Sequence, residues 1–327
     1  MVKFSAFVLL FIAASAAQAQ TASSTPTGNW PAKPIRVIYP FAAGGVGDNS
    51  FRIIAPAIEA KLGQRFVIEA RAGAAGNIAA QEVARAAPDG YTLLMPSTSV
   101  LAINPHLFKN LGFDPLGSFD MISTYSESAP VTFINANIQA RTLKEFVAYA
   151  KANPGKLNYG SPGVGSPSHL VSELLSQLAS ANMTHIAYKG TPPMMQGILA
   201  NDVQMISTTL SAAIAHVKTG RLRVLAAGSR ERLPDGPDVP TATESGFPEL
   251  TASNWWGLVA PKGTPAPIIE RLAAETRAAL ADPATRNRIV EMSMTPLGST
   301  PAQFTSLVKE ELVRWKTVVE RGGIKGE

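Results

Sequence analysis

The sequence contains no cysteine among its 327 residues. This absence excludes disulfide bonds, thiolate catalysis and a lipid anchor carried on a cysteine after a leader peptide. Only 16% of the residues are charged, and the lysines and arginines are scattered rather than gathered in a basic run. We therefore expect no nucleic-acid surface, although the formal net charge of +5 is compatible with an anionic small ligand.

Motifs of catalysis and cofactor binding are also missing. The sequence has no G-x-S-x-G nucleophile elbow, no H-E-x-x-H zinc motif, no EF-hand loop and no glycine-rich nucleotide fingerprint. Its four histidines, His106, His169, His185 and His216, share no metal-ligand spacing. We therefore expect no metal, no cofactor and no enzymatic activity, and a binding protein is favoured over a catalyst.

The first residues have the pattern of a secretory signal peptide. Lys3 precedes an apolar stretch over residues 4–14, and Ala17-Gln18-Ala19 forms an A-x-A cleavage site. The apolar stretch is shorter than a membrane span, and no later stretch is long enough either. We expect cleavage after Ala19, so that residues 1–19 are a signal peptide and residues 20–29 a loose leader.

Strand and helix patterns alternate from Trp30 onward, which predicts an α/β fold with largely parallel sheets. The 46% hydrophobic content and the length suit one large or two medium domains. We expect strands over residues 35–39, 66–69, 91–95, 131–134, 185–188, 203–207 and 222–227, helices over 78–86, 143–152, 168–180, 267–281 and 301–321, and an extended crossing over 254–260.

Two glycine-rich turns, each between a strand and a helix, are the main candidate binding elements. The first spans residues 40–48 and ends at Asp48, which is expected as the helix N-cap. Unpaired N–H groups at the start of a helix attract anions. An ordinary capped turn is the alternative interpretation. The second turn, over residues 160–168, follows the same plan, and two such turns suggest two domains that share one cleft.

Groups of residues in a characteristic order resemble a known family. They are Trp30-Pro31 with Lys33-Pro34-Ile35, Pro40-Phe41 with Gly44-Gly45 and Asp48, Leu62-Gly63-Gln64, Pro88-Asp89-Gly90-Tyr91-Thr92-Leu93, Ala150-Lys151-Ala152-Asn153-Pro154-Gly155-Lys156-Leu157, Tyr159-Gly160-Ser161, Tyr188-Lys189-Gly190, Gly220-Arg221-Leu222-Arg223-Val224-Leu225-Ala226, Val239-Pro240-Thr241, Gly257-Leu258 and Ala260-Pro261-Lys262-Gly263-Thr264-Pro265. Over nearly the whole mature chain, the sequence resembles the periplasmic solute-binding proteins of tripartite tricarboxylate transporters, the Bug proteins.

The resemblance implies a two-domain periplasmic-binding-protein fold of type II, a Venus flytrap with a ligand cleft between its domains. Residues 30–129 and 254–327 would form domain 1, and residues 130–253 domain 2. The implied function is capture of a small organic carboxylate in the periplasm and its delivery to the membrane permease subunits of such a transporter. The protein is expected to be a monomer.

The family pattern also implies a set of ligand-binding positions. In domain 1 they are Phe41, Ala42, Gly44, Gly45, Asp48, Ser97 and Ser99, and in domain 2 they are Tyr159, Gly160, Ser161, Gly165, Ser166, His169, Tyr188, Lys189 and Thr208. Phe41 and Tyr159 are expected to flank a flat ligand. The sequence departs from the family pattern at Ala42-Ala43, where prolines are common, and at Ala70-Arg71-Ala72-Gly73. An acidic residue of some relatives is missing near Gln204 and Thr208.

Neither turn offers an acidic partner for an amino group, so the expected ligand is a dicarboxylate without an amine, aliphatic or aromatic. Two alternatives remain open from the sequence. The same cleft would serve a ligand sensor that presents the acid to a membrane receptor kinase, and the other alternative is a secreted hydrolase on this fold.

Overall fold

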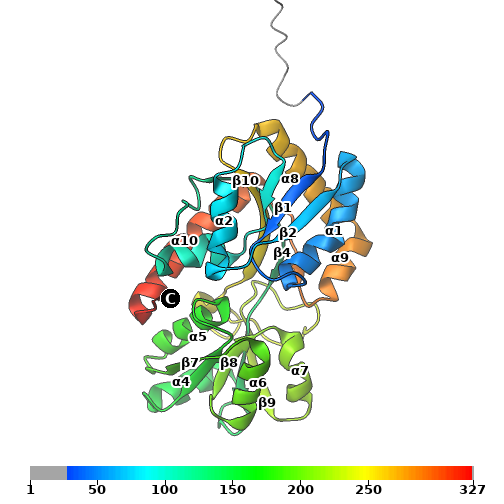
Figure 1. Ribbon diagram of the computed structural model, residues 1–327. Helices are drawn as coiled ribbons and strands as arrows, with labels where there is room; N and C mark the ends of the chain where they lie inside the picture. The colour runs from blue at the N-terminus through cyan, green and yellow to red at the C-terminus, as the bar shows by residue number, and fades with distance from the viewer. Residues whose placement is uncertain (1–27, 326–327) are drawn as a thin grey trace, which may run out of the picture.

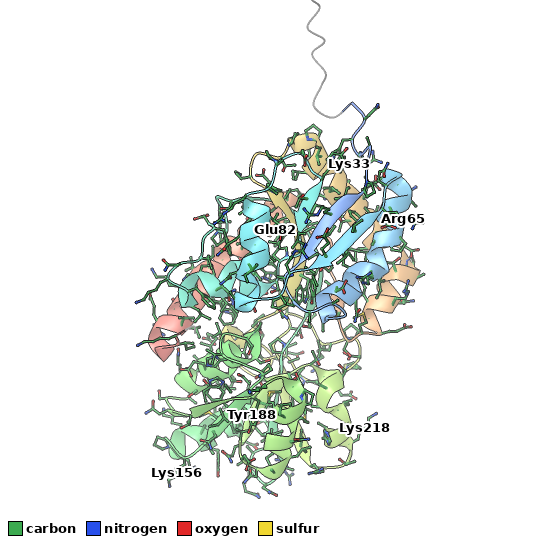
Figure 2. The ribbon with its side chains drawn as sticks, viewed as in Figure 1. Lys33, Arg65, Glu82, Lys156, Tyr188 and Lys218 are labelled. Atoms are coloured by element: carbon green, nitrogen blue, oxygen red, sulfur yellow. The ribbon has the colours of Figure 1, made fainter. Side chains whose placement is uncertain are left out.

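The computed structural model describes residues 28–325, so the expected signal peptide and its cleavage site lie outside the described residues. The chain forms two lobes, each built around one β-sheet (Figure 1). Figure 2 shows the side chains over both lobes, with labels at Lys33, Arg65 and Glu82 in one lobe and at Lys156, Tyr188 and Lys218 in the other.

The first lobe contains a six-stranded sheet with the order β11-β4-β10-β3-β1-β2. Its strands are β1 (Ile35–Tyr39), β2 (Phe66–Ala70), β3 (Thr92–Leu94), β4 (Phe119–Ser128), β10 (Asn254–Pro261) and β11 (Thr295–Pro296). β1 runs parallel to β2 and β3, whereas β10 is antiparallel to β3 and β4.

The second lobe contains a five-stranded sheet with the order β7-β6-β8-β5-β9. Its strands are β5 (Val131–Asn135), β6 (Asn158–Ser161), β7 (Thr184–Ala187), β8 (Met205–Thr208) and β9 (Leu222–Ala227). The α/β class is confirmed, but the expectation of largely parallel sheets is wrong. β5 and β10, the first strands after each crossing between the lobes, are antiparallel to their neighbours.

Helices surround both sheets (Figure 1). They are α1 (Val46–Leu62), α2 (Asn77–Ala84), α3 (Asn104–Leu107), α4 (Leu143–Ala152), α5 (Pro167–Leu178), α6 (Thr191–Ala200), α7 (Leu210–Lys218), α8 (Ala266–Ala281), α9 (Pro283–Val290) and α10 (Pro301–Gly322), with short irregular helices η1 (Ala74–Gly76), η2 (Ser99–Ile103) and η3 (Pro248–Leu250). Each expected helix is present within two residues of its predicted bounds. The sequence patterns did not predict α6, α7, α9 or the long strand β4.

Helix α5 connects the cores of the two lobes. Its Leu170 and Val171 pack in a buried cluster with Trp255 of the first lobe. Its Leu175, and Ala179 directly after its last residue, belong to the core of the second lobe. One face of α5 is therefore fixed against each lobe, and the N-terminus of the helix is held between them.

Over residues 28–325, no helix has the length and apolar character needed to cross a membrane.

Candidate functional site

A cavity of about 410 Å³ lies between the two lobes. It is lined by Tyr39, Phe41, Val46, Ser97, Ser99, Ser128, Ala129, Pro130, Pro162, Ser166, Pro167, Ser168, Thr191, Thr208, Thr209, Ala212, Asn254 and Trp256. The first lobe contributes mainly the ends of its central strands, and the second lobe the N-terminal ends of α5, α6 and α7. Among the described residues that line this cavity, which we call the cleft cavity, none carries a charge.

The structure brings five of the predicted site residues to the cleft cavity. They are Phe41, Ser97, Ser99, Ser166 and Thr208. Four of them carry hydroxyl groups, and Ser166 also caps α5 by accepting a hydrogen bond from the His169 N–H at 3.2 Å. The cavity therefore offers neutral hydrogen-bonding groups from both lobes.

The turn before α1 differs from the expected open anion cradle. The helix N-cap is Gly45 rather than Asp48, and Asp48 lies in the first helical turn. The Gly44 N–H donates to Asp48 Oδ2 at 2.8 Å, and the Gly45 N–H donates to the Ala42 carbonyl at 3.3 Å. The prediction of unpaired N–H groups at these two glycines is therefore wrong, because the protein itself satisfies them. Ala42, Gly44, Gly45 and Asp48 do not line the cavity.

The hydroxyl of Tyr39 lies beside the start of α1. The backbone N–H groups of Gly47 and Asp48, at the start of α1, face this oxygen and lower the pKa of the phenol, although burial raises it by more. Burial raises the pKa of Tyr39 to about 12, so the phenol stays protonated at neutral pH. A Cβ atom on Gly45 would lie 2.4 Å from Tyr39 Oη, which explains why the N-cap is a glycine.

An aromatic wall, formed by Tyr39, Phe41 and Trp256, borders the first-lobe side of the cavity. The ring centroids of Phe41 and Trp256 lie 5.7 Å apart, and those of Tyr39 and Trp256 lie 5.8 Å apart. The Trp256 ring covers Gly47, where a Cβ atom would lie 2.3 Å from Cε3. Trp256 Nε1 and Asn254 Oδ1 are buried and have no hydrogen-bond partner.

The turn before α5 also satisfies most of its own polar groups. The Gly165 N–H donates to His169 Nδ1 at 3.1 Å, and the Ser166 N–H donates to the Gly163 carbonyl at 3.3 Å. The hydroxyl of Ser161 lies 2.7 Å from His185 Nε2. These hydrogen bonds hold the loop on the side away from the cleft cavity, which is not lined by Ser161, Gly165 or His169.

Tyr159 lies on the far side of the same loop. Its ring stacks with those of His169 and His185, and its hydroxyl donates to Glu173 Oε2 at 2.7 Å. These four side chains line a separate cavity of about 310 Å³. The structure therefore does not place Tyr159 opposite Phe41 in the cleft cavity, because this side chain points into the second lobe.

The remaining predicted residues also lie outside the cleft lining. A Cβ atom on Gly160 would lie 3.2 Å from the Tyr188 ring. Tyr188 covers Gly197 of α6, and Figure 2 shows it within the second lobe. Lys189 is exposed and does not line the cavity.

Sequence reasoning missed most of the polar lining. The missed residues with hydrogen-bonding side chains are Tyr39, Ser128, Ser168, Thr191, Thr209, Asn254 and Trp256. A Ser or Thr immediately before a helix is a detectable start signal, and Thr191 and Thr209 stand at the starts of α6 and α7. Within the described residues, no group of three or more His, Cys, Asp or Glu side chains is placed to hold a metal ion.

Comparisons with known proteins agree with this architecture. The model of the family described as "Tripartite tricarboxylate transporter family receptor" (TctC) matches residues 50–324. The chain is 33% identical over 326 residues to protein BugT of Bordetella pertussis, covering 99% of both chains.

Two similar solved structures come from Rhodopseudomonas palustris. Rpa4515 with adipate is 29% identical, with a TM-score of 0.76 over 90% of this chain and 99% of that one. MatC (Rpa3494) with bound malate is 32% identical, with a TM-score of 0.72 over 89% of this chain and 100% of that one.

Proposed function

Because the chain belongs to the tripartite tricarboxylate transporter receptor (TctC) family of periplasmic solute-binding proteins, we propose that it captures a small organic dicarboxylate in the cleft cavity. The observation that carries this proposal is the lining of that cavity. Hydroxyl groups and the N-terminal ends of four helices, α1, α5, α6 and α7, converge on it without a charged side chain among the described lining residues.

Such a lining suits a carboxylate. Neutral O–H and N–H donors bind an anion through charge-assisted hydrogen bonds, each contributing roughly 1.5–3 kcal/mol. The positive ends of helix dipoles add to the same effect. A volume of about 410 Å³ is in the range of small-molecule pockets. The cavity therefore accommodates a small acid with two charged ends.

The lining also argues against an amine on the ligand. A buried ammonium group needs an acidic partner or a set of strong acceptors. The described lining residues include no Asp or Glu. A diacid without an amine, aliphatic or aromatic, therefore fits better than an amino acid. The solved relatives with adipate and with malate support the same ligand class.

The two lobes suggest how the ligand is enclosed. We assign residues 30–129 with 254–327 to domain 1 and residues 130–253 to domain 2, with closure about the two crossings between β4 and β5 and between β9 and β10. Ligand contacts are assigned to the lining residues that carry hydroxyl, indole or phenyl groups, Phe41, Ser97, Ser99, Ser166 and Thr208 among them. We further propose that the protein is exported and cleaved after Ala19. It then delivers the bound acid to the permease of a tripartite tricarboxylate transporter.

A thermal-shift panel tests the ligand class. Succinate, adipate, malate and terephthalate are compared with their mono-amides, with aspartate and with glucose at fixed ionic strength. A ligand at about 100 times its dissociation constant stabilises the fold by roughly 2.7 kcal/mol, which raises the melting temperature by on the order of 2–8 °C. The proposal predicts this shift for at least one diacid and a smaller shift for its mono-amide. Equal shifts for acid and amide, or shifts with the amino acid alone, contradict it.

The transport role requires a separate measurement. Purified protein loaded with a diacid should associate with the detergent-solubilised permease and not with the ectodomain of a sensor kinase. Binding to the sensor ectodomain alone would assign the protein to signalling.

A further inference from the structure

The orientation of the Tyr39 hydroxyl suggests a specific role in ligand binding. Tyr39 is only 2% exposed, yet it lines the cleft cavity at the end of β1. The N–H groups of Gly47 and Asp48 face its oxygen. A phenol has one proton to donate, and the two N–H donors occupy the acceptor side of the oxygen. Because both of these backbone groups are donors, the Tyr39 proton needs an acceptor elsewhere.

No acceptor for this proton occurs among the hydrogen bonds of residues 28–325. The nearby Tyr125 differs in this respect, because its hydroxyl donates to the Gly47 carbonyl at 3.1 Å. Tyr125 is fully buried and does not line the cavity. The two tyrosines thus contact the same turn of α1, but only Tyr39 has a donor left over beside the cavity.

Trp256 gives a second, independent indication on the same wall. It is 5% exposed, it lines the cavity, and its Nε1–H has no hydrogen-bond partner. Buried donors without acceptors are rare in native proteins, and of the three unpartnered indole N–H groups, those of Trp30, Trp255 and Trp256, only that of Trp256 belongs to a residue that lines the cleft cavity. Two such donors on one wall point to an acceptor-rich group of the ligand at this position.

We propose that the Tyr39 hydroxyl donates a hydrogen bond to a carboxylate oxygen of the ligand, so that the N-terminus of α1 acts on the ligand through Tyr39. This inference rests on the proposed carboxylate-binding function. The two N–H groups on Tyr39 Oη polarise the hydroxyl and strengthen it as a donor. Because burial keeps the phenol protonated, the contact persists across neutral pH.

The test compares Tyr39→Phe with Tyr125→Phe by calorimetry, using the diacid that gives the largest thermal shift with the wild type. Tyr39→Phe keeps the ring of the aromatic wall and removes only the hydroxyl. We expect it to weaken binding on the order of 10- to 100-fold, the loss of one hydrogen bond to a charged group. Tyr125→Phe removes a hydroxyl from the same turn and should leave affinity within about threefold of the wild type.

A spectroscopic measurement separates a direct contact from loss of the α1 cap. The protein is labelled with ¹³C at Cζ of its six tyrosines. The Tyr39 resonance is assigned as the one that is missing from the spectrum of Tyr39→Phe. We expect the chemical shift of this resonance to change on saturation with the diacid. A cap alone would leave that resonance in place. Unchanged affinity in Tyr39→Phe, or an unmoved Cζ resonance at saturation, overturns the inference while the carboxylate function stands. If no diacid binds the wild type, the proposed function fails and this inference fails with it.

Discussion

The imidazole rings of His169 and His185 stack face to face, with centroids 3.7 Å apart and ring planes inclined by 11°. Burial, together with the neighbouring imidazole, lowers the pKa of His169 to about 3, and burial lowers that of His185 to about 4. His169 Nδ1 accepts the Gly165 N–H, so the neutral ring holds the loop whose next residue, Ser166, lines the cleft cavity.

This stack predicts a loss of stability in mild acid. In the unfolded chain each histidine takes up a proton near pH 6.5. In the folded state, His185 stays neutral down to about pH 4 and His169 down to about pH 3. The stabilisation is therefore fully present above pH 6.5 and is lost as the pH falls toward these values. We expect urea denaturation to show a decrease of roughly 2 kcal/mol or more in the unfolding free energy from pH 7 to pH 5.

The double variant His169→Gln/His185→Gln tests this prediction, and the single variant His216→Gln is its control. Glutamine at position 169 retains an acceptor for the Gly165 N–H but does not titrate. The double variant should lose most of the difference in stability between pH 7 and pH 5. The control, whose side chain lies on α7 outside the stack, should keep it. An equal pH dependence in both variants would assign the acid sensitivity to other groups.

Asp48 is predicted to support the first turn rather than the ligand. Its carboxylate is buried and accepts from the Gly44 N–H and from Arg52 Nε, at 2.8 and 2.7 Å. An amide cannot accept both bonds without turning its NH₂ group toward a donor. We expect Asp48→Asn to lower the unfolding free energy by about 1–3 kcal/mol, and to change diacid affinity less than Tyr39→Phe does.

Arg52→Gln is the matched control for Asp48→Asn. The Arg52 side chain is 54% exposed, so its ion pair is screened by solvent and contributes at most about 1 kcal/mol. A larger loss in Arg52→Gln than in Asp48→Asn would show that the ion pair, and not the bond to Gly44, stabilises the turn.

Adjacent glycines in this turn should respond differently to the same substitution. Gly44 has a φ of +80°, and a Cβ atom there would meet no atom within 4 Å. Gly44→Ala should therefore cost about 1–2 kcal/mol of stability through backbone strain alone. Gly45 has an ordinary φ of −67°, but its Cβ would displace the Tyr39 hydroxyl. Gly45→Ala should therefore weaken diacid binding in calorimetry by more than Gly44→Ala does, and the reverse order would contradict the role given to Tyr39.

The alternation of strands and helices was predictable because the hydrophobic pattern is local. β1 and β9 have the predicted bounds, and each glycine-rich turn is followed by a helix, as expected. Strand β4 was missed because it buries polar residues. Its Ser123 hydroxyl donates to the Ser299 carbonyl, and its Ser126 hydroxyl donates to Ser50. Such a strand shows no apolar alternation, and its partners lie far away in the sequence.

The site was harder to predict than the fold. Tyr39 ends an apolar run, so its position in the sequence predicts a core residue. The folded turn is needed to bring its hydroxyl next to Gly47 and Asp48. The N–H groups that the sequence suggested were free for an anion are hydrogen-bonded within the same turn. In the second lobe, Tyr159 turned away from the cleft because His169 and His185 complete its stack. Side-chain direction depends on these long-range partners.

The adjacent tryptophans of β10 should report ligand binding separately. Neither indole N–H has a hydrogen-bond partner, but Trp256 lines the cleft cavity, whereas Trp255 is fully buried with its ring 5.1 Å from that of Phe304. Both were expected at an interdomain crossing, but they point to different environments. Titration with a diacid should therefore change the tryptophan emission through Trp256. Trp256→Phe should remove the change and Trp255→Phe should retain it. If the change survives in Trp256→Phe and disappears in Trp255→Phe, the ligand acts on the first-lobe core rather than on the aromatic wall.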